Sequence, residues 1–194
     1  MHRYCTSPSS SGDALLPVTD PTRPDLFYHL VLPPNPLSAH VPAYALSFLV
    51  TPPRTPDASA VIGWLPAQSG GEGQEAGLND FKENPKFREA LHEAILEGLR
   101  EDVDDIPRNG ALQLQEGWLH INDERNLPPL NRVGDPDDII ASVLVVDSKI
   151  QTHTYSAMPS YRICTADGVT QLTEGLTAKL KEVLERRARE ESGM

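Results

Sequence analysis

Short apolar runs separated by prolines dominate the first third of the chain. The runs LFYHLVL at 26–32, YALSFLV at 44–50 and AVIGWL at 60–65 are rich in aromatic and β-branched residues, which favour extended structure. A proline follows each run closely, and proline ends a strand because it has no backbone N–H to donate. The pattern therefore predicts three strands, joined by connections longer than a tight hairpin.

Two later segments have apolar residues at helical spacing. In the first, Asn84 can cap the helix and Pro85 can take the first helical position, and we predict that the helix ends near Arg100. The second is predicted to begin at Thr173. Each has the apolar stripe of an amphipathic helix: Phe87, Leu91, Ala94, Ile95 and Leu99 in the first, and Leu176, Leu180, Val183 and Leu184 in the second.

Apolar and polar residues alternate around three short turns in the second half, which predicts three hairpins. The predicted turns are Glu116-Gly117, Asp147-Ser148 and Asp167-Gly168. In the first hairpin, ALQLQ at 111–115 pairs with WLHIN at 118–122. Strand alternation then gives two faces: a core face with Leu112, Leu114, Leu119 and Ile121, and an opposite face with Gln113, Gln115, Trp118 and His120.

The predicted strands and helices come in blocks rather than in strict alternation. This order favours an α+β fold, with an antiparallel or mixed sheet built largely from hairpins and two amphipathic helices packed on one face. Residues 1–24, rich in Ser, Pro, Thr and Asp, are predicted to be a flexible N-terminal arm. Residues 25–191 are predicted to form a single α+β domain, in which the glycine-rich segment 68–77 is a mobile loop.

The charge of the chain argues against some classes of partner. The formal net charge is −11, and a negative field repels phosphate backbones and anionic lipid surfaces. No apolar run in the sequence approaches the roughly 20 residues of a membrane helix. We therefore expect a protein or small-molecule partner, with no nucleic acid and no membrane, and the pattern leaves the oligomeric state open.

The two cysteines, Cys5 and Cys164, are as few as is usual in a reducing compartment. We expect a soluble, intracellular protein in the cytoplasm, although His2, Arg3 and the early serines leave a mitochondrial presequence open. We expect no cofactor and no metal, because the sequence has no phosphate-binding glycine loop and no Cys/His cluster. The acidic runs at 101–105 and 134–139 lack the ligand spacing of a calcium loop.

The polar residues of GWLHINDERN, at 117–126, form the candidate functional site. A tryptophan and a histidine beside glutamines could stack against a planar ligand or exchange hydrogen bonds with it. The predicted binding residues are Gln113, Gln115, Trp118, His120, Glu124 and Arg125. A purely structural reading stays open, in which these residues are the solvent face of a hairpin and the turn that follows it.

These residues give two functional hypotheses. The first is a non-enzymatic binding or assembly domain that contacts a protein or a small molecule through the face and loop around 113–126. The alternative is a small hydrolase or transferase, with His120 as general base, Asp123 or Glu124 orienting it, and Arg125 holding an anionic substrate. Cys164 is a candidate nucleophile in the alternative, or a small residue packed in a sheet. No motif of the sequence identifies a family with a known activity.

Overall fold

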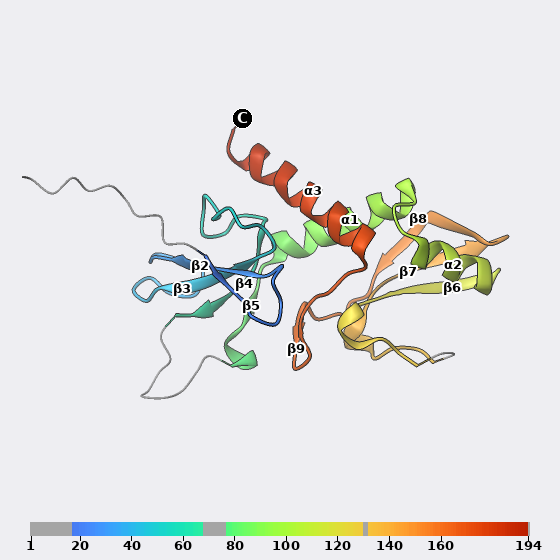
Figure 1. The fold of residues 1–194 in the computed structure, drawn as a ribbon, viewed down its shortest axis with the longest axis horizontal. Coiled ribbons are helices and arrows are strands. Elements are labelled where there is room, and N and C mark those ends of the chain that lie inside the picture. Colours follow the sequence, from blue (N-terminus) through green and yellow to red (C-terminus); the bar gives the residue numbers. More distant parts are fainter. Residues whose placement is uncertain (1–16, 68–76, 130–131, 194) are drawn as a thin grey trace, which may run out of the picture.

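The computed structural model describes residues 17–67, 77–129 and 132–193 (Figure 1). Residues 1–16 of the predicted arm and residues 68–76 of the predicted mobile loop lie outside the described residues. Within residues 17–24, strand β1 (Val18–Thr19) pairs with the next strand, and Arg23 donates hydrogen bonds to the carbonyl oxygens of Val169 and Thr170. Residues 17–24 therefore contact the rest of the chain.

The first sheet contains the three predicted strands. Its strands β1, β2 (Phe27–Val31), β3 (Ala43–Ser47), β4 (Val61–Pro66) and β5 (Lys82–Glu83) lie in chain order, and each neighbouring pair is antiparallel. The predictions for β2, β3 and β4 are confirmed to within a few residues at each end. Strands β3 and β4 are almost wholly buried, because they lie inside the sheet.

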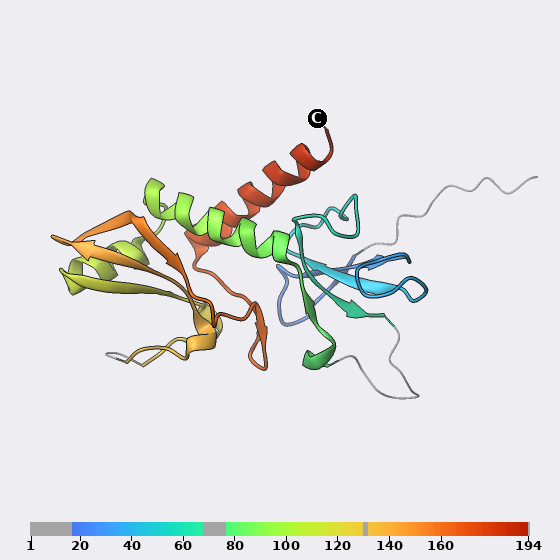
Figure 2. The same cartoon turned by 180° about the vertical axis from the view of Figure 1, so that it is seen from behind.

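Helices α1 (Pro85–Glu101) and α3 (Glu174–Glu191) confirm the two amphipathic helices. The side chain of Asn84 caps α1 by accepting from the backbone N–H of Lys86 at 3.1 Å. All the residues predicted for the two apolar stripes are buried. The helices pack on each other and cross the middle of the molecule (Figures 1 and 2). On their polar sides, Arg186 pairs with Glu93 and Glu97.

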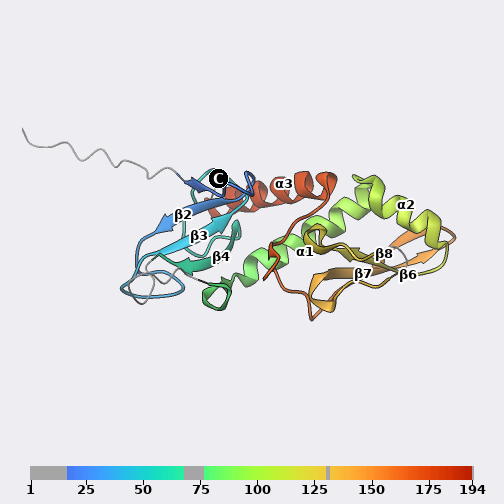
Figure 3. The same ribbon diagram turned by 60° about the horizontal axis from the view of Figure 1, so that its bottom comes forward.

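The second half of the chain forms a three-stranded antiparallel sheet in the order β6 (Gly117–Asn122), β7 (Ile139–Val146) and β8 (Lys149–Ala157). Helix α2 (Asp105–Leu114) packs on β6 and β8 (Figure 3). A two-stranded hairpin, β9 (Cys164–Thr165) and β10 (Gly168–Val169), lies between the two larger sheets (Figure 1). Three short 3-10 helices, η1 (Leu78–Asp80), η2 (Glu124–Asn126) and η3 (Pro136–Asp138), connect these elements.

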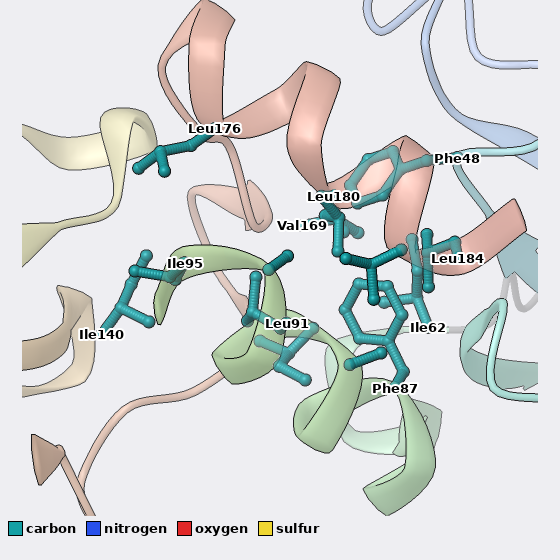
Figure 4. Packing of buried hydrophobic residues seen from close by; sticks show 14 of the residues in the cluster. Phe48, Ile62, Phe87, Leu91, Ile95, Ile140, Val169, Leu176, Leu180 and Leu184 are labelled. Carbon is teal, nitrogen blue, oxygen red and sulfur yellow. The ribbon is translucent and has the colours of Figure 1, made fainter. Parts of the chain in front are cut away.

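One hydrophobic core joins the two larger sheets through the helices. Figure 4 shows Phe87 and Leu91 of α1 on the side of Leu180 and Leu184 of α3, and Ile95 of α1 beside Ile140 of the second sheet. The same core contains Phe48 and Ile62 from the first sheet region and Ile140 from the second sheet. Burying a large apolar side chain contributes about 1.5–3 kcal/mol. The shared core therefore ties the sheets to a common helical centre.

The first predicted hairpin is wrong. Residues 111–115 belong to α2 and its C-cap rather than to a strand, and the side chain of Asp104 caps this helix by accepting from the Ile106 N–H. Strand β6 pairs instead with β7, which places His120 opposite Ser142. The predicted core residues Leu112 and Leu114 are 55% and 38% exposed. The alternating pattern of 111–115 misled the prediction because so short a run fits a helix equally well.

The second hairpin is confirmed and the third is shifted. In the second, Val146 pairs with Lys149 across Asp147 and Ser148, and both turn residues have the positive φ of the tight turns that join antiparallel strands. In the third hairpin, Gly168 pairs with Thr165 and Val169 with Cys164. The turn is therefore Ala166-Asp167 rather than the predicted Asp167-Gly168.

The fold is α+β, with antiparallel sheets built around hairpins and with helices packed against them. The prediction of the class is confirmed, and α2 adds a third helix. None of the helices in the described ranges has a stretch long and apolar enough to cross a membrane.

Candidate functional site

Strand β6 ends in a loop that is held by a buried carboxylate. Asp123 follows β6, and its side chain is fully buried. Its Oδ2 accepts hydrogen bonds from the hydroxyl groups of Tyr161 (2.8 Å) and Thr170 (2.7 Å), and its Oδ1 accepts from the backbone N–H groups of Arg125 (3.1 Å) and Gln171 (3.0 Å). Four donors are as many as a carboxylate usually accepts. Asp123 thereby joins the end of β6 to the segment before α3.

The guanidinium of Arg125 also joins separate segments of the chain through hydrogen bonds. Its side chain is about 1% exposed, and its Nε donates to Asp138 Oδ1 at 2.8 Å. Its Nη atoms donate to carbonyl oxygens at 2.6 to 3.2 Å, those of Asp137, Arg162, Ile163 and Gly168. It also lies 5.6 Å from the centre of the Tyr161 ring. The planar fork of an arginine suits such multiple acceptors, so Arg125 cross-links η2, η3 and the β9–β10 hairpin.

The predicted base His120 lies apart from this network. Its Nδ1 is 2.8 Å from the hydroxyl oxygen of Ser142 on β7, and that hydroxyl also contacts the sulfur of Met158 at 3.6 Å. Between His120 and Asp123 no hydrogen bond occurs in the described part of the chain. The structure therefore does not bring together the predicted base and Asp123 as its orienting carboxylate.

A groove of about 460 Å³ lies between α2 and β6. Its lining residues come from α2, from β6 and η2, and from the start of α3. We call it the α2–β6 groove. The surface that lines it is mostly apolar. The lining residues include three of the predicted binding residues, Gln113, His120 and Glu124, together with Ile106, Pro107, Asn109, Gly110, Leu119, Ile121, Asn122, Leu127, Thr173 and Leu176.

The α2–β6 groove has an acidic end. No lysine or arginine is among the described residues that line it, and Glu124 is its one carboxylate. Burial raises the pKa of Glu124 above its ordinary value, and the nearby negative charges of Asp104 and Asp123 raise it further. A cationic group placed beside Glu124 would oppose both effects, because an opposite charge stabilises the ionised carboxylate.

Two apolar side chains at the border of this groove are more than half exposed. Ile106 of α2 is 57% exposed and Leu127, directly after η2, is 55% exposed. Trp118 of β6 is also exposed, as is Gln115. The side chain of Trp118 lies on the sheet face opposite Leu119, since neighbouring residues of a strand alternate in direction. Gln115 and Arg125 are not among the residues that line the groove.

Cys164 lines a second cavity of about 420 Å³, between the first sheet and the β9–β10 hairpin. Burial raises the pKa of its thiol, although the positive charges of Arg125 and Arg162 act in the opposite direction. His120 is not among the described residues that line this cavity. The candidate nucleophile and the candidate base thus belong to different cavities. Across the described ranges, no group of three or more His, Cys, Asp or Glu side chains is placed to hold a metal ion.

Comparison with known proteins gives no family model, curated protein or solved structure that matches this chain. The site therefore has to be interpreted from its own geometry.

Sequence reasoning missed the partners of the loop and part of the groove. No sequence pattern marks Tyr161, Thr170 or Asp138 as partners of the loop, because a single tyrosine, threonine or aspartate far along the chain does not reveal what it contacts. Ile106 and Leu127 had a weak signal: each is an apolar residue in a run of polar residues and prolines. Such isolated apolar residues are common on surfaces, and only the groove shows that these two border the same hollow.

Proposed function

We propose that the protein is a non-enzymatic binding domain for another protein, and that the α2–β6 groove is its contact surface. The observation that carries the proposal is the groove itself, a mostly apolar hollow of about 460 Å³ whose border includes the exposed side chains of Ile106 and Leu127. An apolar hollow with exposed apolar residues at its border is a usual feature of protein contact sites.

Further exposed apolar side chains in the same region support this proposal. Leu112 and Leu114 of α2 and Trp118 of β6 are exposed, although the short α2 has other residues, Pro107 and Ala111, that pack inward. The fold therefore does not need these three side chains for its core. Tryptophan is one of the residue types that most often contribute a large part of the binding free energy of an interface.

The charge and the cysteine content agree with this kind of partner. A net charge of −11 favours a protein with a basic surface over nucleic acid. The two cysteines support an intracellular, cytoplasmic location. A small molecule that fills the groove is a narrower form of the same proposal.

The test is affinity capture from the native source with matched surface variants. The double variant Ile106→Asp with Leu127→Asp puts charge at both exposed border positions, and we expect it to lose the proteins that the parent captures. Leu32→Asp is the control, since Leu32 is 68% exposed and lies in the first sheet region, away from the groove. Thermal unfolding should be alike in all three proteins. Equal capture by the double variant and the control would contradict the proposal.

The second candidate function is a hydrolase or transferase that uses His120 and Glu124. The observation in its favour is that both residues border the same groove. Asp123 and Arg125 support it less, because their polar atoms are already bonded within the protein. A general base must reach the reacting proton directly or through one water. Turnover of an ester or phosphoester substrate that is lost in His120→Gln would favour this candidate over the binding domain.

A further inference from the structure

We propose that the partner enters the α2–β6 groove as an extended peptide segment that adds a strand along the free edge of β6, with apolar side chains in the groove and a lysine or arginine side chain beside Glu124. This inference rests on the proposed function and specifies the partner of the same site. The occupant is thus a basic and apolar stretch of another protein, in the β conformation.

The first observation is the edge itself. Strand β6 is at the edge of its sheet, with β7 as its one neighbour. In the described chain, the backbone groups of Trp118 to Ile121 make no hydrogen bond outside the β6–β7 ladder. At the edge of an antiparallel sheet, alternate residues direct their N–H and C=O groups outward. Such a row of backbone groups is a template for another strand.

The other edge of this sheet is less suited to a new strand. Ser142 pairs with Ser156 but Leu144 pairs with Gln151, so β8 carries extra residues in a bulge. Within the bulge, the Thr154 hydroxyl accepts from the Leu144 N–H and donates to the Gln151 carbonyl oxygen. A bulge bends and twists a strand and interrupts its pairing. The pairing of β6 with β7 is regular from Gly117 to Ile121, so the straight edge is the one beside the groove.

The second observation is how side chains alternate on β6. Leu119 and Ile121 share the face of β6 toward α2, where Leu119 lies against Gly110 and an added Cβ would be 3.1 Å from Leu119 Cδ1. His120, on the other face, and Asn122 also line the groove. A peptide strand beside β6 would send every second side chain toward the same face. Those side chains would enter the groove beside Leu119 and Ile121, while the others would lie beside His120 and the exposed Trp118. An apolar residue at alternate positions is therefore the pattern that fits.

The third observation is the polarity of the groove. Glu124 is its one carboxylate, and the described lining residues include no lysine or arginine. Asn122 also lines the groove, and no group in the described ranges donates to its buried Oδ1. A partner that supplies a cation and N–H donors would satisfy both acceptors, and a buried acceptor gains most from such a donor. An acidic peptide would instead add to the repulsion that Asp104 and Asp123 already exert on Glu124.

The binding test uses a synthetic probe. A fluorescein-labelled octapeptide, in which valine and serine alternate between a lysine at each end, is titrated by fluorescence anisotropy; the two lysines allow either strand direction. One matched peptide is N-methylated at alternate backbone positions, and another has glutamate in place of both lysines. We expect N-methylation to weaken binding about tenfold or more, because several backbone hydrogen bonds are lost. We expect the glutamate peptide to bind about tenfold or more weakly as well, because its charge repels that of Glu124.

The protein variants locate the charge contact. Glu124→Gln should weaken binding of the lysine peptide and remove the difference in affinity between the lysine and glutamate peptides. Glu116→Gln is the control, because Glu116 is an exposed carboxylate close in sequence that does not line the groove. If Glu116→Gln has the same effect as Glu124→Gln, the attraction is a general charge effect and the assigned contact is wrong.

Hydrogen exchange provides a second measurement that does not depend on any variant. With free peptide at a hundred times its Kd, outward-facing amides in Trp118–Ile121 should exchange about 100-fold more slowly, because about one molecule in a hundred is unliganded. Binding that survives N-methylation, or protection elsewhere than β6, would overturn strand addition. If no peptide binds while protein capture still depends on Ile106 and Leu127, strand addition is wrong and the proposed function stands. If capture does not depend on them either, both are wrong.

Discussion

The hydroxyl of Tyr161 donates to the carboxylate of Asp123 at 2.8 Å, and both side chains are buried. The two residues come from segments far apart in the chain, the end of β6 and the stretch before β9. Burial and the negative charge of Asp123 raise the pKa of Tyr161 well above its ordinary value. Tyr161 is therefore protonated and remains a donor at neutral pH. The loop after β6 owes its conformation to this contact and its neighbours.

Replacement of Asp123 by alanine should destabilise the fold strongly. The variant leaves the hydroxyl groups of Tyr161 and Thr170 without their acceptor and leaves Arg125 with less negative charge nearby. Loss of one partner of a buried ionic network costs about 3–5 kcal/mol, to be measured by urea unfolding. Asp137→Ala, at a half-exposed side chain, is the control and should change the free energy of unfolding by about 0.5 kcal/mol or less.

Arg125→Lys keeps the charge and tests the geometry of the guanidinium. A lysine cannot reach Asp138 and four backbone carbonyl oxygens at once. We expect a loss of about 2–3 kcal/mol, as for buried groups left without a partner, together with faster hydrogen exchange in the β9–β10 hairpin. A variant as stable as the parent would mean that charge alone holds this loop.

His92 should make stability depend on pH. Its Nδ1 is 2.8 Å from the Tyr155 hydroxyl oxygen, and burial lowers its pKa below the ordinary 6.5, with Arg88 adding to the shift. As the pH falls below about 6.5, the unfolded chain binds a proton at His92 before the folded chain does. The stabilising contribution of His92 to the free energy of unfolding is therefore present above pH 6.5 and is lost toward pH 5.5.

The measurement is the change in the free energy of unfolding between pH 7.5 and pH 5.5. His92→Gln should reduce this change relative to the parent. His153→Gln removes an exposed histidine and serves as the control for loss of a histidine as such. An unaltered pH dependence in His92→Gln would show that His92 is not held neutral by its surroundings.

Cys164 should react slowly with thiol reagents. Burial raises the pKa of its thiol, and the thiolate is the reactive form. In a Cys5→Ser background, we expect labelling by a thiol reagent at pH 8 to be slower in the folded protein than in the urea-unfolded protein. Faster labelling of the folded protein would instead indicate an activated thiol and would strengthen the hydrolase or transferase alternative.

Local signals predicted part of the fold well. The strands β2, β3 and β4 and the helix stripes depend on residues within a few positions of one another, and their predictions were confirmed. At α2 the same approach failed, because Leu112 and Leu114 fit a strand as well as a helix. Packing decided the outcome: Pro107 and Ala111 face inward, and Gly110 allows the close approach to Leu119.

In the candidate site as well, local properties could be predicted from the sequence and long-range contacts could not. Alternation correctly separated Ile121, which is buried, from Trp118, which is exposed, because side-chain direction in a strand is a local property. Apart from the contact between Asp123 and the Arg125 N–H, the hydrogen-bond partners of Asp123 and Arg125 lie 12 to 48 residues away, and no local pattern contains them. The sequence by itself determined which segments could bury an apolar face. Only the tertiary structure decided which polar residues of GWLHINDERN stay available to a partner, since a buried polar group takes its role from whichever donors and acceptors the folded chain brings to it.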